Sequence, residues 1–426
     1  MAELIDLSEL QEKVILVAVS TAEEEDTPAS LDELEELAST AGAVTVARII
    51  QNRERVHPGT YLGKGKIDEV RELLWDTRAT GVICDDELSP AQLRNLEDAL
   101  DTKVMDRTMV ILDIFASRAS TREGKIQVEL AQLKYRAVRL VGMRNSLSRL
   151  GGGIGTRGPG EKKLETDRRL IHQRIGQLKE ELADVKRHRE VTRQQREKNF
   201  ALSAAIVGYT NAGKSTLLNR LTGAAIPAND RLFDTLDTTT RTLEISDTCT
   251  VLISDTVGFI RKLPHHLVEA FKATLEELSF ADLLLHVIDA SNPEWREQAA
   301  VVDQLIHELG ADQTPKLEVF NKCDLWTGEI RPHGENIVSI SARTGEGLPA
   351  LLEAIGQRLD SGVKRVTIHL PYDKGGLLDR LYQEAKVEQV DYGETIDVVA
   401  VCTPRTIGQL GPLVEGWQPH REPWDN

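Results

Sequence analysis

Cysteine is scarce in this chain, which has four in 426 residues, Cys84, Cys249, Cys323 and Cys402. They lie far apart in the sequence and form none of the closely spaced pairs that hold zinc. This usage fits a reducing compartment better than a disulfide scaffold.

Long hydrophobic runs are also missing. No apolar stretch approaches the roughly 18 residues of a membrane-spanning helix. Residues 1–12 lack the basic-then-apolar order of a secretion signal. The charged and apolar fractions are those of a globular protein. We therefore expect no membrane span and a cytoplasmic location, with loose membrane association as the alternative. We also expect the free protein to be a monomer.

Positive charge is in short supply, but it is concentrated in one region. The net charge of the chain is −16. Residues 118–198 contain 21 Lys and Arg against 10 Asp and Glu, a local balance of +11 that leaves −27 for the rest. A basic segment in an acidic protein predicts a local anionic partner.

Residues 1–117 alternate strand-like and helix-like segments. Apolar runs at 14–19, 43–47 and 81–84 are typical of buried strands, and helical patterns separate them. This alternation predicts a small α/β domain with a largely parallel sheet. The glycine-rich loop at 59–66 is either a second anion site or a tight strand-to-helix connection. It lacks the full pattern of a phosphate loop, so we favour the connection.

Two series of apolar residues in 118–198 follow the 4-3-4-3 spacing of a coiled-coil seam. Two such helices joined by one loop predict an antiparallel hairpin. Its second helix, from Glu161 to Lys198, would be roughly 55 Å long. Basic side chains, including Arg168 and Arg174, would cover its outer faces. The seam residues are Ile126, Leu130, Leu133, Ala137 and Leu140 in the first helix and Ile171, Ile175, Leu178, Leu182 and Val185 in the second.

The loop that joins these helices, residues 151–160, contains six glycines. Glycine loses the most conformational entropy on ordering, so such a loop does not hold its own conformation. It is either a flexible linker or a loop that becomes ordered on a partner, where Arg157 and the flanking Arg149, Lys162 and Lys163 would meet phosphates. A linker requires neither a basic arm nor this charge, so we favour ordering on RNA.

A phosphate-binding pattern, G-x-x-x-x-G-K-S, lies between an apolar strand-like run and a helix-like run. Backbone N–H groups of such a loop and the following helix N-terminus bind phosphate oxygens. Lys214 would reach the terminal phosphates, and the Ser215 hydroxyl would ligate Mg²⁺. The pattern consists of Gly208, Tyr209, Thr210, Asn211, Ala212, Gly213, Lys214 and Ser215.

Four further segments complete the pattern of a nucleotide domain over residues 199–360. Asp255, at the end of a strand, is placed to hold Mg²⁺ through water, and Gly258 can offer its N–H to a γ-phosphate. The segments are Phe233, Asp234, Thr235, Leu236 and Asp237 in a threonine-rich loop; Asp255, Thr256, Val257 and Gly258; Asn321, Lys322, Cys323 and Asp324; and Ser341, Ala342 and Arg343.

The Asn-Lys-x-Asp segment indicates which base is bound. The carboxylate of Asp324 can accept hydrogen bonds from both N1–H and the 2-amino group of guanine, a donor pair that adenine lacks. Asn321 can meet the N7/O6 edge, and the N–H of Ala342 can donate to O6. These motifs follow a phosphate loop in the order of a guanine-nucleotide domain, so they predict GTP as the substrate.

The pattern of residues 361–426 predicts a strand, a helix and a turn at Gly393 between two further strands, and it contains no catalytic pattern. We expect a small α+β domain here. The chain would then have four domains, at 1–117, 118–198, 199–360 and 361–426.

The phosphate loop, the Thr235 loop, Asp-Thr-Val-Gly, Asn-Lys-x-Asp and Ser-Ala-Arg resemble those of translational GTPases. A basic hairpin with a GGGIGTRGPGE tip precedes them, and the stretches GTYLGKGK and TREGKIQVELAQLKYR lie further upstream. Together they make essentially the whole chain similar to the HflX family of ribosome-associated GTPases. The resemblance implies an α/β fold: a P-loop GTPase domain with an N-terminal α/β subdomain, a long antiparallel helical hairpin and a small C-terminal α+β domain.

The resemblance also implies an activity and partners. These are binding of GTP and GDP, GTP hydrolysis with Mg²⁺ held by Ser215 and Thr235, and association with rRNA and proteins of the large ribosomal subunit. In the family the N-terminal region sits near the peptidyl-transferase region, and some members split stalled ribosomes under stress. Two departures, Asp234 where a small residue is usual and Thr238 where proline is usual, alter the expected rigidity of this loop. The candidate catalytic residues are Lys214, Thr235, Asp255 and Gly258.

One residue that speeds hydrolysis in many GTPases is missing. They orient the attacking water with a glutamine directly after the Asp-x-x-Gly motif, where this chain has Phe259. Phenylalanine neither donates nor accepts a hydrogen bond, so intrinsic hydrolysis should be slow. The missing contribution would come from K⁺ bound near Asn211, as in related GTPases, or from a ribosome contact that orders residues 233–241.

Three functions compete at this point. The first is a GTPase that binds the ribosome and splits or rescues stalled ribosomes through its N-terminal domain and hairpin tip. The second is a GTP-dependent switch that remodels a protein partner, and the third is a scaffold that binds GTP without turnover. The basic hairpin and its glycine tip favour the first.

Overall fold

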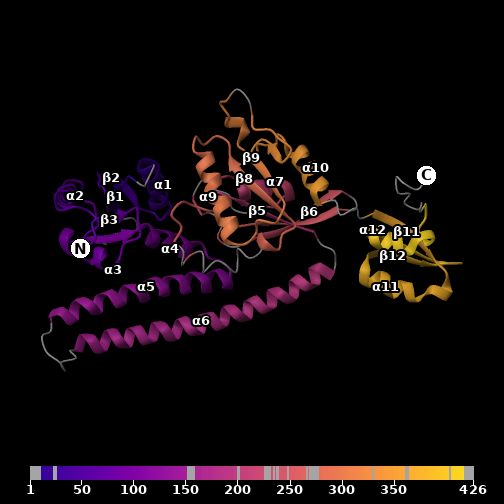
Figure 1. Cartoon of the computed structure of the whole chain (residues 1–426), viewed down its shortest axis with the longest axis horizontal. Helices are drawn as coiled ribbons and strands as arrows, with labels where there is room; N and C mark the ends of the chain where they lie inside the picture. Colours follow the sequence, from indigo (N-terminus) through magenta and orange to yellow (C-terminus); the bar gives the residue numbers. More distant parts are fainter. Residues whose placement is uncertain are drawn as a thin grey trace, which may run out of the picture. The chain divides into compact units, whose positions relative to one another are not determined.

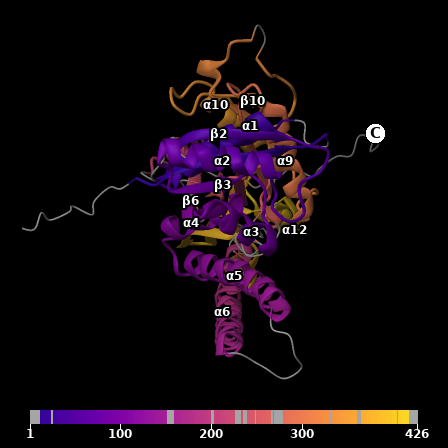
Figure 2. The same ribbon diagram turned by 90° about the vertical axis from the view of Figure 1, so that its left-hand side faces the viewer.

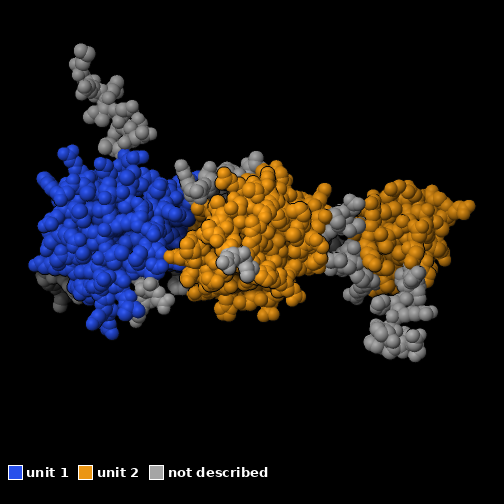
Figure 3. All heavy atoms as spheres, turned by 90° about the horizontal axis from the view of Figure 1, so that it is seen from above, with its two compact units in different colours: residues 1–185, 227–237, 257–275 blue, residues 186–226, 238–256, 276–426 orange. Residues whose placement is uncertain are grey.

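The structure is a computed structural model, drawn as ribbons in Figure 1 and Figure 2. It describes residues 11–22, 26–150, 159–198, 202–224, 232–233, 236, 239–246, 249–264, 267, 278–328, 331–359, 364–402 and 404–416. The chain divides into two compact units, coloured separately in Figure 3. The first comprises residues 1–185, 227–237 and 257–275, and the second comprises residues 186–226, 238–256 and 276–426.

The first unit is built on a parallel sheet of four strands, β1 (Lys13–Ser20), β2 (Val44–Asn52), β3 (Gly81–Cys84) and β4 (Lys103–Asp106). Their order in the sheet is β2-β1-β3-β4. Residues 14–19 of β1 are all buried, as the central position of this strand in a parallel sheet requires. The predicted N-terminal α/β fold is confirmed. Its helices are α1 (Thr27–Thr40), α2 (Lys64–Thr77), α3 (Pro90–Leu100) and α4 (Arg107–Arg118).

Side-chain caps explain where three of these helices begin. The Asp26 carboxylate accepts a hydrogen bond from the N–H of Ala29 at the start of α1. Ser89 and Gln92 form a reciprocal capping box at the start of α3. Asp106 ends β4 and caps α4. Neither β4 nor α4 was predicted from the sequence.

Helices α5 (Arg122–Leu150) and α6 (Pro159–Lys198) form the predicted hairpin and lie side by side (Figure 1). Six of the predicted seam residues pack together: Ile126, Leu130, Leu133, Ile175, Leu178 and Leu182. The sequence predicted Arg174 on an outer face of α6, but in the structure it pairs with α5. Its Nε and Nη2 donate to the carboxylate of Glu129 on α5, at 2.8 and 2.9 Å. The glycine tip at 151–158 lies outside the described residues.

The second unit contains a six-stranded sheet in the order β10-β9-β8-β5-β7-β6, in which β6 alone runs antiparallel to its neighbour. The strands are β5 (Leu202–Gly208), β6 (Thr239–Ser246), β7 (Cys249–Asp255), β8 (Leu283–Asp289), β9 (Lys316–Asn321) and β10 (Ile337–Ser339). The helices include α7 (Lys214–Thr222), α9 (Trp295–Glu308), α10 (Leu348–Leu359) and the short helix η1 (Cys323–Leu325). Four of the five predicted nucleotide motifs, all but 233–237, lie at the carboxyl ends of β5, β7, β9 and β10, the edge where open parallel sheets bind ligands.

The C-terminal residues form a three-stranded antiparallel sheet in the order β11-β13-β12, as the predicted α+β fold requires. Its strands are β11 (Lys364–Leu370), β12 (Lys386–Tyr392) and β13 (Ile396–Cys402), and its helices are η2 (Tyr372–Lys374), α11 (Gly376–Glu384), α12 (Pro404–Leu410) and η3 (Gly411–Leu413). Among the described residues, no helix is long and apolar enough to cross a membrane.

Candidate nucleotide site

The phosphate loop leaves β5 at Gly208 and enters α7 at Lys214. Close packing explains both glycines of the motif. A Cβ at Gly208 would lie 2.3 Å from the carbonyl oxygen of Val287 on the neighbouring strand β8. Gly213 has φ +91°, and a Cβ there would lie 2.3 Å from Nδ2 of Asn321. The loop therefore packs directly against β8 and against the segment predicted to bind guanine.

Lys214 lies under this loop. Its side chain is buried, and Nζ donates a hydrogen bond of 2.8 Å to the carbonyl oxygen of Tyr209. Burial lowers the pKa of Lys214 to about 8, while the negative charge of Asp255 acts in the opposite direction. A buried ammonium with one backbone partner is well placed to exchange that carbonyl for phosphate oxygens.

The side chains of Ser215 and Asp255 meet beside the loop. The Ser215 hydroxyl donates a hydrogen bond of 2.6 Å to Oδ2 of Asp255, and Asp255 is fully buried. A hydroxyl and a carboxylate are the oxygen ligands that Mg²⁺ prefers, so this pair fits the predicted ion. The other predicted ligand, Thr235, lies outside the described residues, as do Asp234 and Asp237.

Asn321 connects the phosphate loop with the segment predicted to bind guanine. Its Nδ2 donates to the carbonyl oxygen of Ala212 at 2.9 Å, and its Oδ1 accepts from the N–H of Ala342 at 2.9 Å. The Asn321 side chain and the Ala342 N–H were predicted to meet the edge of the base, whereas in the structure they hydrogen-bond to each other. Asn321 therefore also braces the site internally, a role that the sequence analysis missed.

Lys322 and Asp324 complete this segment. Lys322 adopts a left-handed backbone conformation with φ +60°, and its Nζ lies 2.7 Å from Oδ2 of Asp289 at the end of β8. This ion pair ties the segment to the end of β8. Asp324 is exposed at the start of η1, so its carboxylate is accessible to a ligand. Asp289 was missed, although a carboxylate at a strand end is a recognisable signal.

Two predicted nucleotide loops pack within the first unit. Residues 227–237 and 257–275 cluster there, and Leu232, Phe233 and Leu236 are buried. The ring of Phe233 meets that of Phe115 on α4 edge-to-face, with centroids 4.8 Å apart. Phe259, which stands where many GTPases have a glutamine, is also buried. These contacts could not be predicted from the sequence, because they join residues far apart in the chain.

Family models match four consecutive parts of the chain. Their descriptions are "GTP-binding GTPase N-terminal" at residues 28–116, "GTP-binding GTPase Middle Region" at 118–196, "50S ribosome-binding GTPase" at 203–322 and "HflX C-terminal domain" at 330–401. Together they span most of the described residues, including the whole phosphate loop and the Asn-Lys pair of the guanine segment.

Full-length relatives agree with these matches. GTPase HflX of Lacrimispora saccharolytica is 63% identical over 397 residues, which are 90% of this chain and 94% of that protein. GTPase HflX of Escherichia coli K12 is 45% identical over 393 residues, 91% and 92% of the two chains. A GTP-binding protein from Sulfolobus solfataricus, solved in complex with GDP, is 24% identical with a TM-score of 0.44, over 82% of this chain and 98% of that one. The identity to the two HflX proteins, 63% and 45% over nearly the whole length, shows that the chain belongs to the HflX family of ribosome-binding GTPases and is a GTP hydrolase.

Proposed function

We propose that the protein is a cytoplasmic, Mg²⁺-dependent GTPase, monomeric when free, that binds the large ribosomal subunit and splits or rescues stalled ribosomes under stress. The observation that carries this proposal is the hairpin region at residues 118–198, which includes α5 and α6 and holds a balance of +11 in a chain of net charge −16. Such a basic arm fits the phosphate backbone of rRNA. The family description "50S ribosome-binding GTPase" supports the choice of the large subunit.

The nucleotide would be bound by the groups described above. The N–H groups of residues 208–215 would surround the phosphates, and Asp324 would select guanine. Mg²⁺, held by Ser215 and Thr235 with Asp255 acting through water, would neutralise charge on the β- and γ-phosphates. Lys214 would stabilise the charge that develops as water attacks the γ-phosphorus in line. K⁺ bound near Asn211 stays a hypothesis, which equal turnover in Na⁺ and K⁺ would contradict.

The nucleotide would control binding to the ribosome. Contacts of Thr235 and Gly258 with Mg²⁺ and the γ-phosphate would order both loops, and hydrolysis would release them. GTP would then favour association with the large subunit and GDP would favour release. Equal affinity of the two forms for large subunits would count against this part of the proposal.

The salt dependence of binding separates an RNA partner from a protein partner. We expect the affinity of the GTP-bound protein for purified large subunits to fall steeply with salt. Each phosphate contact contributes about 0.7–0.9 to the slope of log affinity against log salt concentration. Arg168 and Arg169 are exposed on α6. The double variant R168Q/R169Q should lower the affinity and reduce the slope by about 1.5, measured by co-sedimentation between about 50 and 200 mM salt.

The matched control is R296Q/R331Q, which removes two exposed positive charges from the second unit. Neither arginine lies on the hairpin, so this variant should keep the slope of the unmodified protein. A slope near zero for the unmodified protein would instead favour the second candidate, a switch that remodels a protein partner.

A further inference from the structure

The segment that follows Gly258 is held by the N-terminal part of the chain. Residues 257–275 cluster with residues 1–185 in the first unit. Among the described residues of this segment, Val257, Phe259, Ile260 and Leu267 are buried. The apolar packing therefore restrains the residues on both sides of Gly258, which is the predicted γ-phosphate contact.

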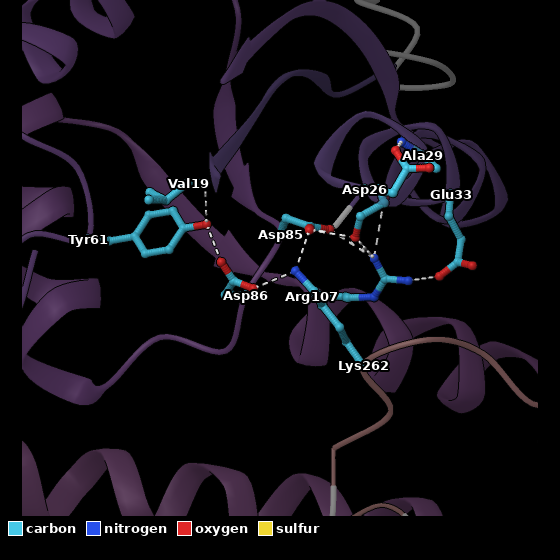
Figure 4. A network of polar contacts seen from close by, with 10 residues as sticks. Val19, Asp26, Ala29, Glu33, Tyr61, Asp85, Asp86, Arg107 and Lys262 are labelled. Atoms are coloured by element: carbon cyan, nitrogen blue, oxygen red, sulfur yellow. Dashed lines mark hydrogen bonds and ion pairs between the residues drawn. The ribbon is translucent and has the colours of Figure 1, made fainter. Parts of the chain in front are cut away.

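Lys262 adds a polar contact at the end of this buried stretch. Its Nζ donates to Oδ2 of Asp85 at 2.8 Å and to Oδ1 of Asp86 at 2.7 Å, directly after β3 (Figure 4). The backbone of Lys262 adopts φ +52°, a left-handed conformation that disfavours residues with a Cβ. Glycine is the residue that such a position ordinarily favours. A lysine in this conformation indicates that the contacts of its side chain offset the cost of the backbone conformation.

The two carboxylates that receive Lys262 are themselves held in place. Asp85 is fully buried, and it accepts hydrogen bonds from Nη1 of Arg107 at 2.8 Å and from the Ser30 hydroxyl at 2.6 Å. The Tyr61 hydroxyl donates to Oδ2 of Asp86 at 2.6 Å and accepts from the N–H of Val19 at 3.2 Å. The acidic pair is therefore a rigid receptor fixed to the parallel sheet.

Tyr61 belongs to the glycine-rich loop at 59–66, whose purpose the sequence left open. In the structure this loop runs from β2 into α2, and Tyr61 is buried with φ +60°. Its hydroxyl touches the same carboxylate that receives Lys262. The loop thus acts on Asp86, and through Asp86 on the segment that carries Gly258.

Lys262 remains charged in this setting. Burial opposes its charge, but the two carboxylates outweigh burial and raise its pKa above the ordinary value. Burial raises the pKa of Asp85, and Lys262 and Ser30 counteract it. Arg107 supplies a second cation to Asp85, so the buried carboxylate keeps a partner when Lys262 is removed. The fold therefore does not depend on Lys262 alone.

We infer that Lys262 is a positioning residue for GTP: by binding Asp85 and Asp86 it restrains the segment 257–262, which carries Gly258. The inference rests on the proposed contact of the Gly258 N–H with the γ-phosphate. GDP has no γ-phosphate and does not use this N–H. The restraint on the segment therefore contributes to the discrimination between GTP and GDP and to the rate of hydrolysis.

The test measures nucleotide affinities of the free, full-length protein without ribosomes, so its outcome is independent of the ribosomal role. In K262M we expect the affinity for a non-hydrolysable GTP analogue to fall about tenfold, the effect of losing one hydrogen bond to a charged oxygen. The affinity for GDP should be unchanged, and kcat should fall. K262R keeps the charge and should restore the affinity for the analogue. D86N should change it in the same direction as K262M.

The control is K103M, since Lys103 lies in β4 of the same sheet and makes an exposed ion pair with Glu12. It should leave both affinities unchanged, and thermal unfolding of every variant checks the fold. An unchanged ratio of analogue to GDP affinity in K262M would reduce the contact to a structural one. A higher analogue affinity or a higher kcat would show that Lys262 holds the segment away from the γ-phosphate. Either result overturns the inference.

Discussion

Replacing Lys214 by methionine is expected to abolish most GTP turnover. The ammonium is buried beneath the phosphate loop, where it donates a hydrogen bond to the carbonyl oxygen of Tyr209. Removing one partner from a buried, hydrogen-bonded charge pair costs about 2–5 kcal/mol. At about 1.4 kcal/mol per tenfold, this corresponds to a loss of roughly 30- to 3,000-fold in kcat/KM. Methionine has a similar length and suits the buried position, so the fold should survive.

Steady-state GTP turnover checks this expectation, together with thermal unfolding of the variant. K316M is the matched control, because Lys316 lies at the start of β9 and makes exposed ion pairs with Asp303 and Glu318. It should turn over GTP like the unmodified protein. A K214M protein that is folded and retains turnover within about threefold would contradict the assignment of Lys214 to the phosphates.

Replacing Asp324 by asparagine is expected to change which base the protein binds. The carboxylate can accept from N1–H and the 2-amino group of guanine, and each hydrogen bond to a charged group contributes about 1.5–3 kcal/mol. An amide offers one acceptor and one donor, so the donor would face the 2-amino group. The affinity for GDP should fall by about 100-fold or more. Xanthine carries an oxygen in place of that amino group, and this oxygen can accept a hydrogen bond from the asparagine amide. The affinity for xanthosine diphosphate (XDP) should therefore rise.

Competition of GDP, XDP and ADP against a fluorescent guanine nucleotide measures this change. Asp324 is exposed, so the substitution should not disturb the fold. D312N removes an exposed carboxylate elsewhere in the second unit and should keep the preference for GDP. Undiminished GDP affinity in D324N, or a gain for ADP in place of XDP, would show that the base lies elsewhere.

The nucleotide motifs could be read from the sequence because each one is local. The phosphate loop follows a buried strand and opens a helix. Gly208 and Gly213 therefore indicate positions where the backbone packs closely against a neighbour. In the structure these neighbours are Val287 and Asn321. The seam of α5 and α6 was predictable for the same reason. Apolar residues such as Ile126 and Leu130 follow the 4-3 spacing that is typical of a coiled-coil seam.

The contacts of the nucleotide loops could not be predicted in this way. Lys262 and Asp85 are separated by 177 residues. The residues around Lys262 form no sequence pattern from which its partner could be predicted. Phe115 and Phe233 likewise come from an unpredicted helix and a polar loop. Asn321 was assigned to the base by its motif, whereas its bonds to Ala212 and Ala342 depend on how β5 and β9 are placed in one sheet. Long-range pairing of this kind is set by tertiary packing.

The central claim is that a ribosome contact at the hairpin supplies what Phe259 does not. The most direct test compares GTP turnover with and without purified large ribosomal subunits, for the intact chain and for a chain lacking residues 151–160. We expect slow turnover of the protein alone, strong stimulation of the intact chain by the subunits, and loss of that stimulation on deletion. Basal and subunit-stimulated rates that agree within error for the intact chain would contradict it.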